Sequence, residues 1–251
     1  MQSWVRRFLP SAFTLGNLYL GILAIVLVVS GEHWRSASFV IIVGMFFDGL
    51  DGRLARMLDV SSSFGKELDS LADVITFGVA PAVLLIYLRP ESALYHVAAV
   101  VFAFCGAIRL ARFNTQPSLL KGHFTGLPIP AAGGLAATAT LYFHQVPWGL
   151  LPAVFFGLAA LMVSRVPYPD FKGVRLPQSQ VVLAITIVGT VIVLWFARSF
   201  VFVPLVLYAL FGLGWHRALW RRLPVAWKIR YEKQKAARLK RRLEKRARRV
   251  K

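Results

Sequence analysis

Apolar stretches long enough to span a membrane recur along most of this chain, and they constrain its fold more than any other feature. About 20 apolar residues in a helix cross the hydrocarbon core of a bilayer. The chain has 251 residues and is 57% hydrophobic, and no stretch alternates polar and apolar residues as the strands of a membrane barrel do. We therefore predict an all-α, polytopic membrane helical bundle. The eight expected spans are residues 11–30, 38–57, 65–88, 92–113, 128–144, 148–164, 180–197 and 201–220.

The basic residues indicate which side of the membrane each connection faces, because short cytoplasmic loops are enriched in Lys and Arg. The second, fourth and sixth connections, with the span ends beside them, each carry three basic residues, whereas the other four carry one or none. We predict that both termini are cytoplasmic, in a multi-pass protein of the cell (inner) membrane. The first apolar stretch has full spanning length and no small-residue cleavage site after it, so we expect a span there and not a signal peptide.

The C-terminal segment is far more basic than the rest of the chain. Residues 217–251 hold 16 of the 30 Lys and Arg residues and only two Glu. We predict a membrane domain over residues 1–220 and a basic cytoplasmic tail over residues 221–251. Such a tail would bind anionic lipid headgroups, at about 1 kcal/mol per cation, or it could be a solvated segment that only fixes topology. No nucleic acid partner is expected, because the aromatic residues do not continue past Tyr231.

Six of the 11 acidic residues lie between positions 48 and 73, five of them within two predicted spans and one in the connection between them. An Asp at the centre of a span costs on the order of 2.5–3.5 kcal/mol, so intramembrane carboxylates usually mark function. Asp48 and Asp51 are three residues apart, and Asp69 and Asp73 are four apart, spacings that put each pair on one helix face. A short connection makes the two helices antiparallel neighbours. We therefore expect the four carboxylates to converge at the cytoplasmic ends of these helices.

Clustered carboxylates are the ligands that hard divalent cations prefer, so the cofactor predicted here is Mg²⁺ or Mn²⁺. The chain offers no softer site, because its single cysteine, Cys105, lies within an apolar span and is expected only to pack there. A divalent cation at a cytoplasmic surface most often meets phosphate, whose charge it neutralises. The sequence therefore predicts a phosphorylated substrate.

Small residues beside the carboxylates leave room for a ligand or a neighbouring helix. We assign Gly49 to helix packing and Gly52 to close approach of the ligand. Arg56, one turn after Gly52, is placed to meet a phosphate. The other two acidic residues of the segment, Asp59 and Glu67, fall outside the spacing and are expected at a loop and a helix interface.

The spacing as a whole resembles the signature of the CDP-alcohol phosphatidyltransferase family. The matching residues are Asp48, Asp51, Gly52, Ala55, Arg56, Gly65, Asp69 and Asp73, with every gap of the signature kept. The resemblance implies a membrane enzyme that displaces CMP from a CDP-linked lipid with the hydroxyl of an alcohol. It also implies a homodimer.

The resemblance assigns roles residue by residue. Metal binding falls to Asp48, Asp51, Asp69 and Asp73, and Asp73 would also be the catalytic base that takes the proton of the attacking hydroxyl. The CDP-lipid site falls to Gly52, Ala55, Arg56 and Gly65. Family members commonly carry Asn where this chain has Ser11, so Thr14 is expected to share in holding the nucleotide.

Four further stretches, SLADVITFGVAPA, CGAIRLARFN, FTGLPIPAAGG and VPYPDFK, resemble the bacterial and archaeal members of this family that use serine as the alcohol. The implied substrates are CDP-diacylglycerol and L-serine. Arg109, Arg112 and Asn114 are the candidate contacts to serine or phosphate, because Arg binds carboxylates and phosphates in a bidentate manner. His123 is expected to be a loop residue.

Other functions remain open on the sequence alone. The acceptor could be glycerol 3-phosphate, inositol phosphate or choline, since the arginine pair could equally bind a phosphorylated alcohol. A cation transporter is a remote alternative, because its carboxylates would be expected nearer the membrane midplane on discontinuous helices. A non-catalytic membrane anchor with a partner-recruiting tail is the third alternative.

Overall fold

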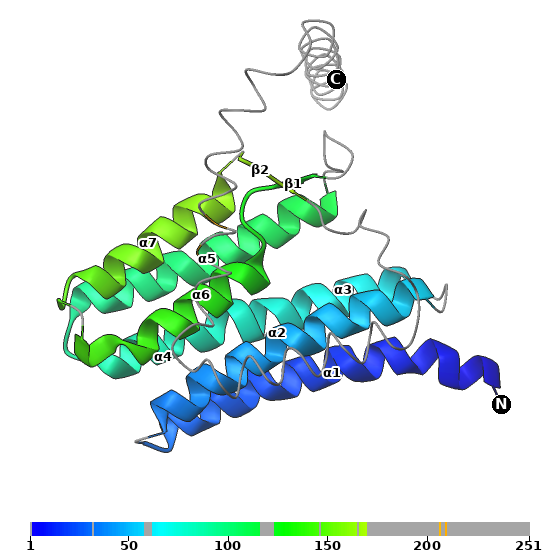
Figure 1. Cartoon of the computed structure of the whole chain (residues 1–251), viewed down its shortest axis with the longest axis horizontal. Coiled ribbons are helices and arrows are strands. Elements are labelled where there is room, and N and C mark those ends of the chain that lie inside the picture. The colour runs from blue at the N-terminus through cyan, green and yellow to red at the C-terminus, as the bar shows by residue number, and fades with distance from the viewer. Residues whose placement is uncertain are drawn as a thin grey trace, which may run out of the picture.

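The computed structural model describes residues 2–31, 33–57, 62–115, 123–145, 147–164 and 166–169, with residues 206 and 209. For residues 2–10, 51–57, 123, 124, 167 and 169 it describes the backbone only. Long helices make up most of this part of the chain (Figure 1). The α-helices are α1 (Gln2–Val29), α2 (Trp34–Met57), α3 (Ser63–Asp73), α4 (Ala80–Leu88), α5 (Ala93–Thr115), α6 (Ile129–Leu141) and α7 (Leu150–Val163). The all-α class is thereby confirmed, and the first six predicted spans each coincide with helical structure.

Three helical stretches are long and apolar enough to cross a membrane, namely Ser11–Val29, Ser63–Leu88 and Ala93–Thr115. These helices, by their length and composition, indicate a membrane protein. Helices α6 and α7 are apolar but have 13 and 14 residues, fewer than the about 20 that span a bilayer core. The predicted spans at residues 180–197 and 201–220 and the basic tail lie outside the described residues, apart from residues 206 and 209, so the count of eight spans and the orientation stay predictions.

A π-helical segment, η1 (Val74–Val79), joins α3 to α4, so that Ser63–Leu88 runs as one continuous helical rod. Helices α1, α2, α5 and α6 all contact η1 or its flanking helices, and Figure 1 shows α1 and α2 running side by side below α3. A π-helical turn inside an α-helix often occurs at a functional site. This one begins directly after Asp73.

Glycines on three helices allow η1 to be approached closely. A Cβ atom added at Gly21 of α1 would lie 2.4 Å from Thr76 Oγ1, and one at Gly44 of α2 would lie 2.8 Å from Thr76 Cγ2. On α6, a Cβ at Gly133 would lie 2.7 Å from the Phe77 Cα atom. We call Gly21, Gly44 and Gly133 the glycine socket, because they admit the η1 segment between three helices.

Gly133→Ala is expected to destabilise the protein by roughly 1–3 kcal/mol, the usual cost of overpacking a tight core. The added methyl group would meet backbone atoms of Phe77, which cannot rotate away as a flexible side chain can. The apparent unfolding midpoint in detergent, measured at one fixed scan rate, should fall. Gly157→Ala on α7 is the matched control, since its added Cβ meets no described atom within 4 Å. Equal midpoints for the two variants would contradict the packing argument.

Two short strands, which the sequence analysis did not predict, lie beside the ends of α5 and α7. Strand β1 (His123–Thr125) pairs antiparallel with β2 (Pro167–Pro169), with Phe124 opposite Tyr168. His123, expected in a loop, therefore belongs to a strand. The Tyr168 side chain is buried and its hydroxyl donates to the carbonyl of Ala209 at 3.3 Å, and burial raises the pKa of this phenol so that it stays a donor.

The loop that follows β1 depends on one glycine with a left-handed conformation. Gly126 has φ +83°, and a Cβ there would lie 2.3 Å from the carbonyl oxygen of Met162. Pro128 then caps α6 with an extended backbone. Gly126 and Pro128 thus fix the connection from β1 to α6.

Candidate metal centre

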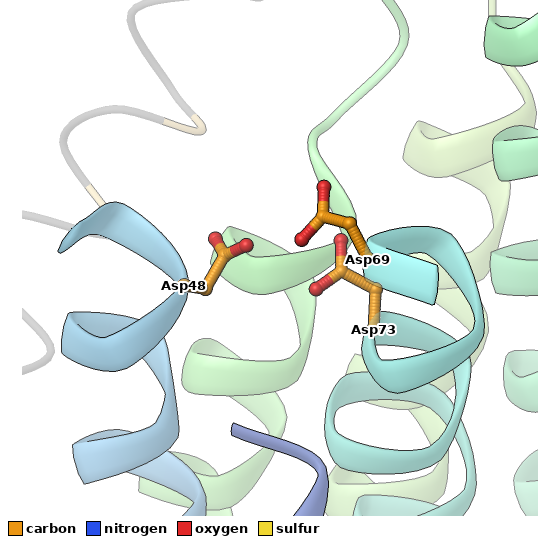
Figure 2. A group of neighbouring side chains, drawn as sticks. All are labelled: Asp48, Asp69 and Asp73. Carbon is orange, nitrogen blue, oxygen red and sulfur yellow. The ribbon is translucent and has the colours of Figure 1, made fainter. Parts of the chain in front are cut away.

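Three carboxylates from two helices meet at one point of the structure. One oxygen each of Asp48, Asp69 and Asp73 lies within 4.8 Å of the others. Figure 2 shows the Asp48 side chain on α2 pointing toward the two aspartates on α3. Asp73 is buried, with 6% of its surface exposed, and the other two are half-buried. The predicted convergence is therefore found for the three carboxylates that the structure describes.

Local structure at the start of α3 sets the direction of its two aspartates. The Ser62 side chain caps the helix by accepting a hydrogen bond from the Gly65 N–H at 2.9 Å. Residues four apart then lie one above the other, so Asp69 and Asp73 face α2 together. Gly65 belongs to this first turn, where a Cβ would lie 3.1 Å from the Ser62 hydroxyl.

The three carboxylates fit a hard divalent cation. Such cations bind oxygen at about 2.0–2.6 Å, so two ligands of one ion lie up to roughly 4–5 Å apart. Three negative charges at this spacing, one of them buried, repel each other unless a cation or protons compensate them. The donor set is all oxygen, which suits Mg²⁺ and Mn²⁺ and not the softer metals.

Other residues of the family signature lie on the same helix but outside the described side chains. Asp51, Gly52, Ala55 and Arg56 belong to α2, for which the structure describes only the backbone at these positions. Their roles as metal or nucleotide contacts stay predictions. Gly49 is described and exposed, and a Cβ there would meet no described atom within 4 Å. The assignment of Gly49 to helix packing therefore stays a prediction, because no described residue packs against it.

Helix α1 supplies a polar wall beside Asp73. Asn17 is fully buried, and its Nδ2 atom donates to Asp73 Oδ1 at 3.4 Å. Thr14, the predicted nucleotide contact, is also buried and lies one turn earlier on the same face. Asn17 was not among the predicted site residues, although an amide in the middle of an apolar span is a signal that could have identified it.

Helix α5 supplies the three residues predicted to contact serine or phosphate. Arg109 is buried, with 6% of its surface exposed, and its guanidinium lies 5.4 Å from the centre of the Phe113 ring. Asn114 is exposed, and its Nδ2 atom donates to Ser70 Oγ at 3.0 Å and to Glu67 Oε2 at 3.4 Å. These contacts join the end of α5 to α3 beside Asp69, and they place Glu67 at a helix interface as predicted.

Arg112 holds three segments together. Its guanidinium donates to the carbonyl oxygens of Val163 at 2.7 Å, Met162 at 3.1 Å and Ser164 at 3.2 Å, which end α7. It also donates to the carbonyl of Thr125 in β1 at 3.1 Å. A cation at a helix C-terminus satisfies carbonyls that have no partner within the helix. Arg112 thus has a structural role in the described protein, and its contact with substrate stays a prediction.

Comparison with known proteins extends the likeness beyond the signature. The family model described as CDP-alcohol phosphatidyltransferase matches residues 7–201. The chain is 39% identical over 170 residues to the CDP-diacylglycerol–serine O-phosphatidyltransferase of Bacillus subtilis, across 66% of this chain and 92% of that protein. Proteins of the same name from Helicobacter pylori strain J99 and Methanocaldococcus jannaschii are 33% and 36% identical, over 81% and 80% of this chain and 89% and 90% of theirs.

Proposed function

Because the chain belongs to the CDP-alcohol phosphatidyltransferase family, we propose that it transfers the phosphatidyl group of CDP-diacylglycerol to L-serine, giving phosphatidylserine and CMP. The observation that carries the proposal is the meeting of Asp48 on α2 with Asp69 and Asp73 in the second half of α3. A phosphoryl transfer site of this family calls for such a carboxylate cluster. The names of the relatives support serine as the acceptor.

In the proposed reaction the serine oxygen bonds to the lipid-side phosphorus, and the bond from that phosphorus to the oxygen of CMP breaks. A divalent cation bound by the carboxylates would neutralise the pyrophosphate and stabilise the departing CMP. Asp48, Asp51 and Asp69, with one oxygen of Asp73, would hold this cation. Asp73 would take the proton of the serine hydroxyl, for which a base must lie within about 3 Å of the oxygen.

The proposed contacts to serine and to the CDP moiety come from residues beside the carboxylate cluster. Arg109 is the proposed partner of the serine carboxylate, because the planar guanidinium of Arg binds carboxylates in a bidentate manner. Thr14, Gly52, Ala55, Arg56 and Gly65 would bind the CDP moiety. Arg112 and Asn114 stay predictions as substrate contacts, since their described hydrogen bonds join α5 to α7, β1 and α3.

We also propose that the site opens to the cytoplasm from the cell (inner) membrane, with both termini on that side. The basic tail would bind anionic lipid headgroups there. A homodimer is proposed from the family alone.

The acceptor is tested by comparing alcohols on the purified full-length protein in mixed micelles of detergent and CDP-diacylglycerol. We expect CMP release and a labelled lipid product with serine in the presence of Mg²⁺ or Mn²⁺. Glycerol 3-phosphate, inositol phosphate and choline should give no more product than the Asp73→Asn variant, which supplies the background. Release that requires glycerol 3-phosphate and ignores serine would replace serine with a phosphorylated acceptor.

A further inference from the structure

Asn17 is the polar side chain of α1 that reaches the carboxylate cluster. Its Nδ2 atom donates to Asp73 Oδ1 at 3.4 Å, and no part of the residue is exposed. This bond is longer than the usual separation of about 2.9–3.0 Å, so its energy is small and its effect is mainly directional. The contact joins residues 56 positions apart in the sequence.

The backbone around Asn17 is fixed against the same helical rod. The carbonyl oxygen of Asn17 accepts a hydrogen bond from the Thr76 hydroxyl at 2.9 Å. Gly21 of the glycine socket lies one turn further along α1 and meets Thr76 as well. Because α1 contacts the rod through both Asn17 and Gly21, the backbone of Asn17 is held next to the helical rod that carries Asp73.

Packing alone does not explain an amide at this position. The Oδ1 atom of Asn17 is buried and has no hydrogen-bond partner among the described residues. A buried acceptor left without a partner costs free energy that an apolar side chain of the same shape would avoid. Leucine has that shape and suits an apolar span. The amide is therefore a net cost to folding unless its donor serves the carboxylate.

We propose that Asn17 is a positioning residue, which fixes the plane of the Asp73 carboxylate so that Asp73 faces Asp48 and Asp69. The inference rests on the cation site of the proposed function. The Asn17 amide holds Oδ1 of Asp73 by a hydrogen bond. The other carboxylate oxygen of Asp73 is thereby oriented toward the shared cation. Outer hydrogen bonds of this kind commonly orient metal-binding carboxylates.

The test measures Mn²⁺ binding to the full-length protein in detergent, with the free-ion signal followed by electron paramagnetic resonance. Asn17→Leu is expected to weaken Mn²⁺ binding by roughly 10–100-fold, the usual effect of removing such an outer partner. Its apparent unfolding midpoint should equal or exceed that of the unsubstituted protein, because the variant removes a buried polar group. A purely structural role would leave the Mn²⁺ affinity unchanged.

Thr76→Val is the matched control, because it removes the hydrogen bond to the Asn17 backbone and spares the contact with Asp73. It should lower the unfolding midpoint and leave the Mn²⁺ affinity unaltered. If Asn17→Leu does not fold, Asn17→Ala makes the same comparison. Wild-type affinity in the folded Asn17 variant, or equal weakening in Thr76→Val, would overturn the positioning role. Absence of Mn²⁺ binding by the unsubstituted protein would instead overturn the cation site itself.

Discussion

Replacing Asp73 with asparagine is expected to lower the rate of CMP release by about 10²–10⁴-fold, the range contributed by general acid–base catalysis. Asparagine has the same size but cannot accept the serine proton. It also removes a negative charge from the carboxylate cluster. Its side-chain oxygen can still accept the hydrogen bond that Asn17 donates to Asp73, so the variant should fold.

The matched control for Asp73→Asn is Glu67→Gln. Glu67 lies on the same helix but is exposed, accepts a hydrogen bond from Asn114, and lies outside the carboxylate cluster. Glutamine keeps that acceptor, so the variant should retain full activity. Both proteins are compared for serine-dependent CMP release and for elution from size exclusion. A folded Asp73→Asn variant that synthesises lipid at the normal rate would favour the non-catalytic anchor.

Removing divalent cations is expected to abolish CMP release entirely. Without a cation, the carboxylates of Asp48, Asp69 and Asp73 would face the pyrophosphate with like charge, and the departing CMP would have no compensating charge. Exhaustive treatment with EDTA should therefore reduce CMP release to the level measured without enzyme, at or below that of Asp73→Asn. Mg²⁺ or Mn²⁺ should restore it, because both prefer oxygen ligands.

The variant Asp48→Asn tests the same dependence on a divalent cation by weakening its binding instead of removing the cation. It should raise the cation concentration that gives half-maximal activity by roughly tenfold or more, since even an outer partner of a metal ligand is commonly worth 10–100-fold. Glu67→Gln should leave that concentration unchanged. Activity that survives chelation would show that the carboxylates do not serve through a metal ion.

The sequence predicted the parts of this structure that depend on local spacing. Apolar stretches identify the helices because membrane-spanning segments must satisfy their backbone hydrogen bonds internally. The four-residue interval between Asp69 and Asp73 identifies a shared face because helical geometry determines it. The short link between α2 and α3 then makes Asp48 their neighbour.

Features that depend on contacts between distant segments were missed. The pairing of β1 with β2 joins residues more than 40 positions apart, and neither three-residue strand has a periodic signal of its own. The π-helical course of Val74–Val79 has no local signature in this sequence either. The partners of Arg112 could not be predicted either. Its position at the end of a span suggested a contact with an anion, whereas in the structure its guanidinium binds carbonyl oxygens of α7 and β1.

The glycine socket bears on how this site could be moved between proteins. The signature carboxylates come from one continuous stretch of sequence. The helical rod that carries Asp69 and Asp73, however, packs closely against the glycine socket on three other helices, and Gly133 of that socket lies 60 positions after Asp73. Transferring the signature alone into another protein would therefore move the metal ligands without the three glycines that hold their helix in place. Chimeras between members of this family should keep their activity only when α1, α2 and α6 come from the same parent as α3.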